Sequence, residues 1–334
     1  MTVSDDTGSS TGRVTIRDVA RAAGVSRQTV TRAINEMADI SVETRARVMK
    51  TVEELGYRPN RFAIDLSRQR THAVGLLVGS FRNPYYAQLA DSFISELRKR
   101  DWQVVIGSAG PDEAGAIRSM AAQTDAIIGY FLRPQKQTVA AARGLPIVLL
   151  EERATLPGLH SVEFDIRDGI IQLVADLRAR GARRFAMIDA ANDYPGGFIE
   201  SPRRRYFEEA VGASCPVVTH TESIAGGMTG FRELLTQDPD IDTILTFNDL
   251  MAMGAVQGSH VMGIDVPGAV RIVGIDGISL GEATSPTLTT LSLQSEVIAT
   301  EAAAILARIF SGEDRTTGSI TRTVSPVVLW RESA

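Results

Sequence analysis

The stretch that decides the fold is VTIRDVARAAGVSRQTVTRAI, residues 14–34, near the amino end of the chain. Thr15 precedes an apolar pattern of helical period, and Asp18 follows three residues later, which is the capping box that starts a helix. Gly24 then permits a tight turn, and Ser26 can cap a second helix over RQTVTRAI. Two short helices joined by a glycine-containing turn predict a helix-turn-helix. The expected inward faces are Val19, Ala20 and Ala23 in the first helix, and Val30, Ala33 and Ile34 in the second.

The second of these helices presents groups that suit DNA. In a helix-turn-helix this helix lies in the major groove, with its first residues against base edges. The periodicity leaves Arg27, Gln28 and Arg32 outward, and arginine pairs with guanine while glutamine pairs with adenine. The same pattern also fits a small helical hairpin with a solvated basic face, so both interpretations stay open on pattern alone. Short polar side chains suited to phosphate oxygens are Thr15, Ser26, Thr29, Thr31 and Asn35.

A third helix and a linker complete the predicted amino-terminal domain, residues 14–59. Ser41 caps the third helix, and three short helices provide only a small core. Residues 60–72 are interpreted either as a plain linker or as a segment that orders when it meets a partner. Residues 1–13 are polar and are expected to form a disordered tail. The buried side of the third helix is predicted to consist of Ala46, Val48, Met49, Val52 and Leu55.

These residues resemble the start of the lactose-repressor (LacI/GalR) family of bacterial transcription regulators. Three pieces match in order and spacing: VTIRDVARAAGVSRQTVTRAIN, ISVETRARV and ELGYRPN. The resemblance implies that Arg27, Gln28 and Arg32 read bases. The positions that hold the DNA backbone in the family are here Thr15, Ser26, Thr29, Asn35, Ser41, Thr44 and Tyr57.

The resemblance also implies that residues 60–72 form a hinge helix that folds only on operator DNA. Leu66 matches the leucine that wedges into the minor groove, where an apolar side chain unstacks a base step and bends the duplex. Ala63 matches the small residue that packs beside its dimer mate. Ile64 and Asp65 depart from the family pattern, because an arginine is common at the first position and the second places a carboxylate near phosphates.

Composition is consistent with a basic end on an acidic body. The 334-residue chain has a net charge of −5, but residues 1–70 carry 12 Lys/Arg against 9 Asp/Glu, whereas the remainder carries 23 against 31. Such a distribution suits an end that meets a polyanion, although the excess is small. No apolar run is long enough to cross a bilayer, no secretory signal precedes the domain, and Cys215 is the only cysteine. A cytoplasmic protein without a disulfide is therefore expected.

From Ala73 onward the sequence alternates between apolar runs and helical patterns, which predicts parallel sheets with helices on both faces. The family resemblance continues to about Trp330 and implies a two-lobed, periplasmic-binding-protein-like domain over residues 73–332. The expected N-lobe is about 73–164 plus 294–323, and the C-lobe is about 165–292 plus 324–332. The predicted strands are AVGLLVG, WQVVIGS, DAIIGY, PIVLL, RFAMIDA, DTILTF and VRIVGID, with helices near 84–100, 112–122, 136–143, 198–212, 228–236, 249–261 and 296–310.

Open α/β sheets bind ligands outside the carboxyl ends of their strands. Carboxylates and amides pair with hydroxyl groups while aromatic rings cover apolar faces, so the residues after these strands suit a sugar or polyol in an interlobe cleft. An alternative stays open for Asn248 and Asp249, which could simply cap the next helix, and for Tyr85 or Tyr86, which could be core. The candidates are Asn83, Tyr85, Tyr86, Glu151, Arg203, Asn248, Asp249 and Asp276.

The resemblance agrees with this set. TFNDLMAMGAV matches the family's Asn-Asp-x-Met-Ala segment, Asp276 its cleft aspartate and Arg203 its effector-contacting arginine. Glu151 stands where many members have aspartate. Tyr206 replaces a usual glycine, and AGGMTGF lacks an aromatic residue that some sugar binders place near its start, so the ligand's identity stays open.

We therefore expect a DNA-binding transcription regulator, a repressor, controlled by a small polar ligand. Two copies should pair through the body to reach two half-sites of a pseudo-palindromic operator, with tetramers as a further option. The rival interpretations are a solute-binding protein and an enzyme that uses the cleft carboxylates. The sequence has no Ser/His/Asp arrangement, metal-ligand spacing or Gly-rich phosphate loop, so no catalytic residue, metal or cofactor is expected.

Overall fold

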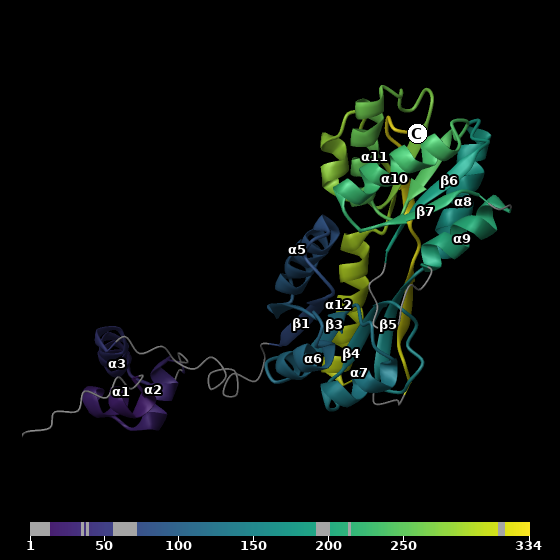
Figure 1. Cartoon of the computed structure of the whole chain (residues 1–334). Coiled ribbons are helices and arrows are strands. Elements are labelled where there is room, and N and C mark those ends of the chain that lie inside the picture. Colours follow the sequence, from purple (N-terminus) through teal and green to yellow (C-terminus); the bar gives the residue numbers. More distant parts are fainter. Residues whose placement is uncertain are drawn as a thin grey trace, which may run out of the picture. The chain divides into compact units, whose positions relative to one another are not determined.

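The computed structural model divides the chain into two compact units, residues 1–71 and 72–334. It describes residues 14–34, 37, 40–55, 72–191, 201–212, 215–312 and 318–334. We call residues 14–55 the amino-terminal unit and residues 72–334 the body, and treat each by itself. Figure 1 shows the three helices of the first and the two sheets of the second.

The amino-terminal unit contains three helices around a small apolar core. They are α1 (Ile16–Ala23), α2 (Arg27–Ile34) and α3 (Val42–Glu54). The start of α1 is held as predicted, because the Asp18 carboxylate accepts from the Thr15 backbone N–H at 2.9 Å and from its hydroxyl at 2.6 Å. Gly24 has a φ of 67°, the left-handed conformation that glycine adopts without strain. The fully buried core consists of Val19, Val30 and Val48, with Ala20, Ala23 and Ala33 beside them.

The predicted inward face of α3 was wrong at three positions. Val48 is buried and Val52 is half-buried, but Ala46, Met49 and Leu55 are exposed. Thr51 is buried instead, and its hydroxyl donates to the Arg47 carbonyl at 3.0 Å. The two short helices that α3 packs against cover only a narrow stripe, so fewer apolar residues are buried than the sequence provides.

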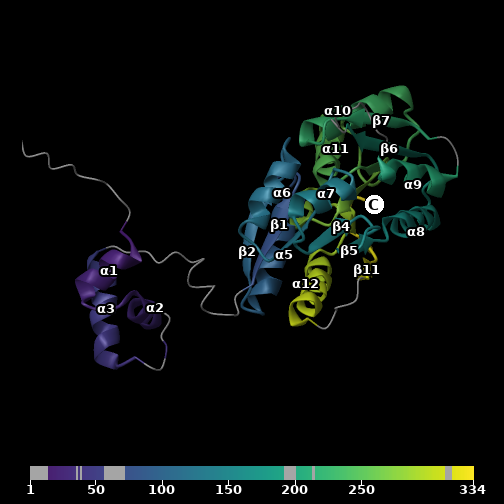
Figure 2. The same cartoon turned by 90° about the horizontal axis from the view of Figure 1, so that it is seen from below.

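One half of the body is built on a six-stranded, all-parallel sheet in the order β11-β5-β4-β3-β1-β2. Helix α12 packs on α5, β5 and β11, so it belongs to this lobe although it comes late in the sequence (Figures 1 and 2). The strands are β1 (Ala73–Val78), β2 (Gln103–Ser108), β3 (Ala126–Gly129), β4 (Ile147–Glu151), β5 (Leu159–Phe164) and β11 (Thr321–Val324), and the helices are α5 (Pro84–Arg98), α6 (Glu113–Ala121), α7 (Gln135–Ala142) and α12 (Ser295–Ser311).

The other half repeats this plan with the order β12-β10-β9-β8-β6-β7, in which only β12 is antiparallel to its neighbour. The strands are β6 (Phe185–Ala190), β7 (Val217–His220), β8 (Thr243–Thr246), β9 (Arg271–Asp276), β10 (Thr289–Ser292) and β12 (Val327–Leu329), and the helices are α8 (Ile166–Ala179), α9 (Pro202–Val211), α10 (Ile224–Gln237), α11 (Asp249–Met262) and the short 3-10 helix η1 (Ser279–Ala283). We call the two halves the N-lobe and the C-lobe.

The chain crosses between the lobes between β5 and α8, between β10 and α12, and between β11 and β12. Each strand predicted from the sequence is present, but β5, β7, β10, β11, β12 and helix α8 were not identified. Four of these strands have only three or four residues, which gives the alternation of apolar residues little length to show. Among the helices that the structure describes, none is long and apolar enough to span a membrane.

Candidate nucleic-acid interface and interlobe ligand site

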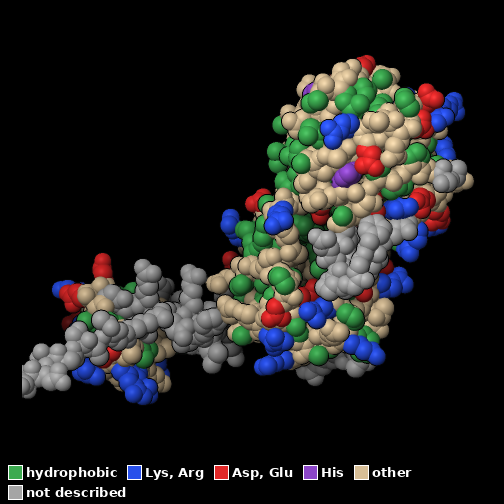
Figure 3. All heavy atoms as spheres, in the orientation of Figure 1, with side chains coloured by type: hydrophobic (Ala, Val, Ile, Leu, Met, Phe, Trp, Pro, Cys, Tyr) green, Lys and Arg blue, Asp and Glu red, His purple; other side chains and the backbone are tan. Residues whose placement is uncertain are grey.

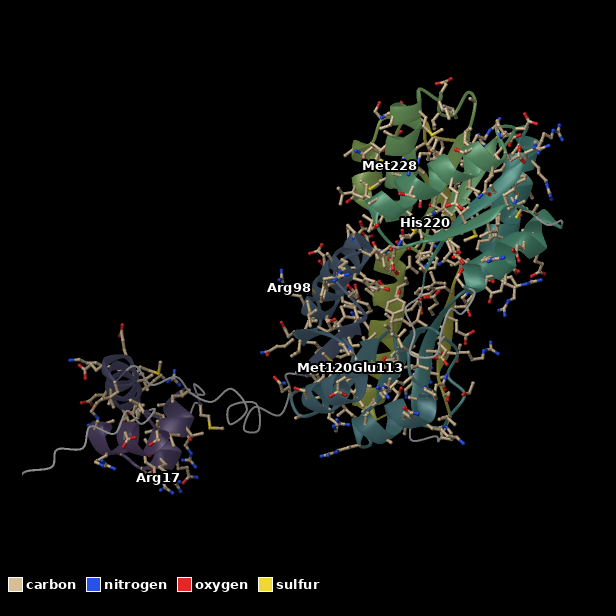
Figure 4. The ribbon with its side chains drawn as sticks, in the orientation of Figure 1. Arg17, Arg98, Glu113, Met120, His220 and Met228 are labelled. Carbon is tan, nitrogen blue, oxygen red and sulfur yellow. The ribbon has the colours of Figure 1, made fainter. Side chains whose placement is uncertain are left out.

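The outward side of α2 carries the residues predicted to read bases. Arg27 and Gln28 are exposed, whereas Arg32 is partly buried. Figure 3 shows Lys and Arg side chains along the lower edge of the amino-terminal unit and others at its upper left, and Arg17 of α1 is labelled in Figure 4. Arg27 and Gln28 lie in the first turn of α2, and Arg32 lies in its last turn. Guanidinium and amide groups in these positions can contact the base edges and phosphates of a duplex.

The short hydroxyl side chains predicted to face phosphates also cap the helices. Ser26 Oγ accepts from the Thr29 N–H at 3.0 Å and lies 2.9 Å from the Thr29 hydroxyl. Ser41 Oγ accepts from the Thr44 N–H at 3.2 Å. A hydroxyl has one donor and two acceptor positions, so a capping hydroxyl retains capacity for a second partner.

Thr15 and Thr31 are engaged in the same local way. The Thr15 hydroxyl donates to Asp18, and this hydrogen bond, followed by that of the Thr15 backbone, lowers the pKa of the Asp18 carboxyl. The Thr31 hydroxyl donates to the Arg27 carbonyl at 3.1 Å. The expectations for Asn35, Tyr57, Ala63 and Leu66 concern residues outside the described ranges.

In the body, two asparagines begin helices from opposite lobes and point their amide nitrogens toward the same carboxylate. Asn83 Oδ1 accepts from the Tyr85 N–H at 3.0 Å at the start of α5, and Asn248 Oδ1 accepts from the Met251 N–H at 3.0 Å at the start of α11. Because capping uses the oxygens, the Nδ2 groups are the free ends. They donate to Glu222 Oε1, at 3.3 Å from Asn83 and 2.7 Å from Asn248.

Asp276 joins this set from the end of β9. Its Oδ2 accepts from Asn83 Nδ2 at 2.9 Å, and its Oδ1 lies 3.5 Å from the Arg203 guanidinium. Arg203 also donates to the Phe247 carbonyl and lies 4.6 Å from the centre of the Phe247 ring. We call Asn83, Tyr86, Glu151, Arg203, Glu222, Asn248 and Asp276 the interlobe cluster; Asn83, Tyr86 and Glu151 come from the N-lobe.

Burial keeps the Asp276 carboxyl protonated at a higher pH than is usual for an aspartate. Removal from water raises its pKa to about 8, nearby Asp249 and Glu222 raise it further, and Arg203 and the Asn83 amide oppose the rise. A carboxyl in this state can donate or accept a hydrogen bond near neutral pH.

Asp249 does not cap α11, although that role was open from the sequence. It is fully buried and holds the loop after β9: its Oδ2 accepts from the Gly277 and Ile278 N–H groups, each at 2.8 Å, and its Oδ1 accepts from the Thr290 hydroxyl at 2.5 Å. Asn248 performs the capping and also faces the cluster. Asp249 is therefore a support for the loop that carries Asp276, not a ligand-facing residue.

Three tyrosines lie on the N-lobe side. Tyr85 is almost fully buried and its hydroxyl lies 2.9 Å from that of Tyr130, so Tyr85 belongs to the core. Tyr86 is half-buried, with its ring centre 5.5 Å from that of Tyr130. Burial raises the pKa of all three phenols well above the usual range, so they stay neutral donors. Glu151, the last residue of β4, is exposed and has a left-handed backbone with a φ of 71°.

Glu222 and Gln88 were missed by the sequence analysis. Glu222 follows the carboxyl end of β7, two residues after His220, which Figure 4 labels. Recognition of the four-residue strand β7 would have placed Glu222 at a strand end. Gln88 lies within α5 and connects the lobes, donating to the Gly277 carbonyl at 3.3 Å and accepting from the Ser279 N–H at 3.0 Å. Within the described ranges, no group of His, Cys, Asp and Glu residues could hold a metal ion.

A helix-turn-helix unit, followed in one chain by a two-lobed α/β body with a polar cluster between its lobes, is the organisation of a ligand-responsive transcription regulator. Comparison with known proteins specifies the class. Residues 15–60 match the family of bacterial regulatory proteins named lacI, and residues 174–334 match a periplasmic binding protein-like domain. The chain belongs to the LacI family of bacterial regulatory proteins.

Individual relatives support this assignment over most of the chain. The chain is 31% identical over 335 residues to the HTH-type transcriptional regulator CelR of Thermobifida fusca, covering 95% of this chain and 96% of that protein. It is 28% identical over 333 residues to the HTH-type transcriptional regulator GalR of Escherichia coli K12, covering 96% and 95%. A solved structure of a CelR–cellobiose complex superposes with a TM-score of 0.67 at 29% identity, over 96% of this chain and 100% of that one.

Proposed function

We propose that this protein is a sequence-specific DNA-binding transcription regulator, a repressor, whose affinity for its operator is set by a small polar ligand bound at the interlobe cluster. The observation that carries the proposal is the presence of two polar sites of different kind in one chain. One is the outward side of α2, with Arg27 and Gln28 exposed, and the other joins Asn83 to Glu222 and Asp276 between the lobes.

On DNA, Arg27, Gln28 and Arg32 read base edges from the major groove. The capping hydroxyls and the neighbouring polar residues hold phosphates, and the segment with Ala63 and Leu66 meets the minor groove between half-sites. Counterion release makes this binding fall steeply with salt. The phosphate-facing set is Thr15, Ser26, Thr29, Thr31, Asn35, Ser41, Thr44 and Tyr57.

Two copies pair through the body, so that two amino-terminal units reach a pseudo-palindromic site. Exposed large apolar side chains on both lobes support this pairing, since a second copy would remove them from water. Figure 3 shows such side chains on both lobes. They include Phe81, Ile106, Ile224, Val261 and Leu280.

The ligand is a sugar or polyol. The amides of Asn83 and Asn248, the guanidinium of Arg203 and the carboxyls supply donors and acceptors for hydroxyl groups, and the Tyr86 ring offers an apolar face. The structural neighbour solved with cellobiose supports this ligand class. Because Asn83 and Gln88 bridge the lobes, a ligand that alters these contacts changes the angle between lobes and hence the spacing of the DNA-binding units. Coupling of this kind is typically about 1–3 kcal/mol and acts equally in both directions.

The protein acts in the cytoplasm as a sensor and not as an enzyme or an exported solute-binding protein. The attached amino-terminal unit argues against the second alternative, and the regulators among its relatives argue against the first. A turnover assay with candidate sugars separates sensor from enzyme, because a sensor releases its ligand unchanged.

Selection of genomic fragments by the purified full chain at moderate salt tests the proposal. We expect a reproducible set of fragments with a shared pseudo-palindrome to be retained over random competitor DNA. Equal retention of genomic and random fragments, with and without sugars, would contradict the proposal.

A further inference from the structure

The interlobe cluster has more acidic than basic groups. Three carboxyls, those of Glu151, Glu222 and Asp276, act electrostatically on the one guanidinium, that of Arg203. Arg203 pairs with Asp276 at 3.5 Å, donates to the Phe247 carbonyl and lies over the Phe247 ring. In the part of the chain that the structure describes, Glu151 and Glu222 form no ion pair of their own.

The asparagine amides of the cluster already have carboxyl partners. The Asn83 amide donates to Glu222 and Asp276, and the Asn248 amide donates to Glu222. An anionic ligand would compete with the carboxyls for these amides and would face the carboxylates of Glu151 and Glu222, so charge repulsion opposes its binding. A neutral sugar can pair with the carboxyls through its hydroxyls, but leaves their charge uncompensated.

An ammonium group fits these acceptors better. It has three N–H donors and no acceptor, whereas a carboxylate accepts only, so one ammonium can pair with two carboxylates at once. Glu222 is half-buried, and its Oε1 accepts both amide bonds, whereas its Oε2 accepts none from the residues that the structure describes. A ligand cation would also favour the ionised form of Asp276, which burial otherwise holds protonated at neutral pH.

We propose that the effector is a polyhydroxylated compound bearing a protonated amine, with Glu222 as the residue that selects the amine. The inference rests on the proposed function, since it concerns the same interlobe site. Metal ions are a less suitable source of positive charge here, because no described group of acidic, histidine or cysteine residues has a metal-binding arrangement.

The test compares matched probes on the purified full chain at about pH 6.5, below the usual pKa of an α-amino group. Glucosamine, glucose and glucuronate form one set, and β-1,4-linked diglucosamine, cellobiose and cellobiouronate form another. Thermal shift and calorimetry give the affinities. We expect the amine member to bind about tenfold or more tightly than its neutral twin, as a charged hydrogen bond allows, and the acid to bind weakest.

Variants then assign the selectivity. Glu222→Gln, which keeps shape and removes charge, should bring the amine and neutral members within about twofold of each other, well inside the tenfold of one charged contact. Glu151→Gln, at an exposed position of the cluster, gives a second measurement if the first variant is unstable, with a smaller expected loss of preference. Glu296→Gln removes the same charge from an exposed site on α12 and should leave the preference intact.

Equal or tighter binding of the neutral or acidic members, or no binding of either amine, would overturn the inference. So would an unchanged amine preference in both Glu222→Gln and Glu151→Gln. The proposed function is tested separately by fragment selection: recovery of a shared operator together with binding of neutral sugars alone would retain the regulator and remove the amine.

Discussion

The two polar sites of this protein are held together in opposite ways. In the amino-terminal unit, each hydrogen bond of Thr15, Ser26, Thr31 and Ser41 joins residues three or four positions apart, at the surface. In the interlobe cluster, Asn83 donates to Glu222 and Asp276, which lie 139 and 193 positions away; the first bond is partly buried and the second is buried. Local surface contacts are individually weak and independent, whereas buried long-range contacts depend on one another. Substitutions should therefore alter DNA recognition without unfolding in the first site, and alter ligand response, stability and pH dependence together in the second.

A substitution at Asp276 tests most directly whether ligand response can be lost without loss of operator binding. Asp276→Asn keeps the shape but removes the carboxyl that faces Asn83 and Arg203, so ligand response should be lost while operator binding persists. Operator-binding titrations with and without the best-binding sugar measure both quantities. Normal release of operator by ligand in this variant would remove Asp276 from the ligand site.

Asp249 should show the largest effect on stability. Asp249→Ala removes three hydrogen bonds to a buried carboxyl and frees the loop after β9, at a cost of about 3 kcal/mol or more in unfolding free energy. Both tryptophans, Trp102 and Trp330, lie in the body, so fluorescence-monitored urea unfolding reports on the body. Asp240→Ala, at an exposed position after α10, is the control and should change stability by less than about 0.5 kcal/mol. Similar losses in the two variants would contradict the role of Asp249.

Arg32→Ala should change operator binding by the amino-terminal unit and leave the stability of the body unchanged. Loss of its contact should weaken operator binding by about 1–3 kcal/mol and relax sequence choice, with unfolding of the body unchanged. Binding to a set of single-base operator variants measures the discrimination. A uniform loss across all sequences would instead indicate that Arg32 contacts phosphate.

The same contrast explains what the sequence could predict. The capping roles of Ser26, Ser41 and Asp18 follow from neighbours three residues away, so the helix-turn-helix was predictable in detail. In the body, the rule that ligands bind at strand ends selected Arg203, Asn248 and Asp276, and the fold brings all three into the interlobe cluster, where ligand contact stays a prediction. It could not find Glu222, because β7 is only four residues long, nor distinguish the roles of Asn248 and Asp249, because the groups that Asp249 holds lie 28 to 41 positions away.

The pH dependence of stability should differ between the sites as well. Burial raises the pKa of Asp276 from its ordinary value of 3.8 to about 8. Between these two pH values the folded protein keeps the carboxyl proton, whereas the unfolded chain has lost it. Stability should therefore fall as pH rises toward 8, by up to about 1.4 kcal/mol per pH unit. Arg203, Glu222 and Asp249 face this carboxyl, and the raised pKa of Asp249 leaves part of the slope in Asp276→Asn. Urea unfolding from pH 5.5 to 8.5 should show a shallower decline in the variant; equal slopes would contradict the buried protonated carboxyl.

The smallest expected effect lies in the caps of the amino-terminal unit. Ser26→Ala removes the acceptor for the Thr29 N–H and should lower the local stability of α2 by about 1 kcal/mol. Hydrogen exchange of residues 27–34 should then be about fivefold faster, while α3 changes less. Ser41→Ala should show the reverse pattern, because its hydroxyl caps α3 and not α2. If either variant speeds exchange equally in both helices, the unit opens as a whole, and its surface contacts are as interdependent as those between the lobes.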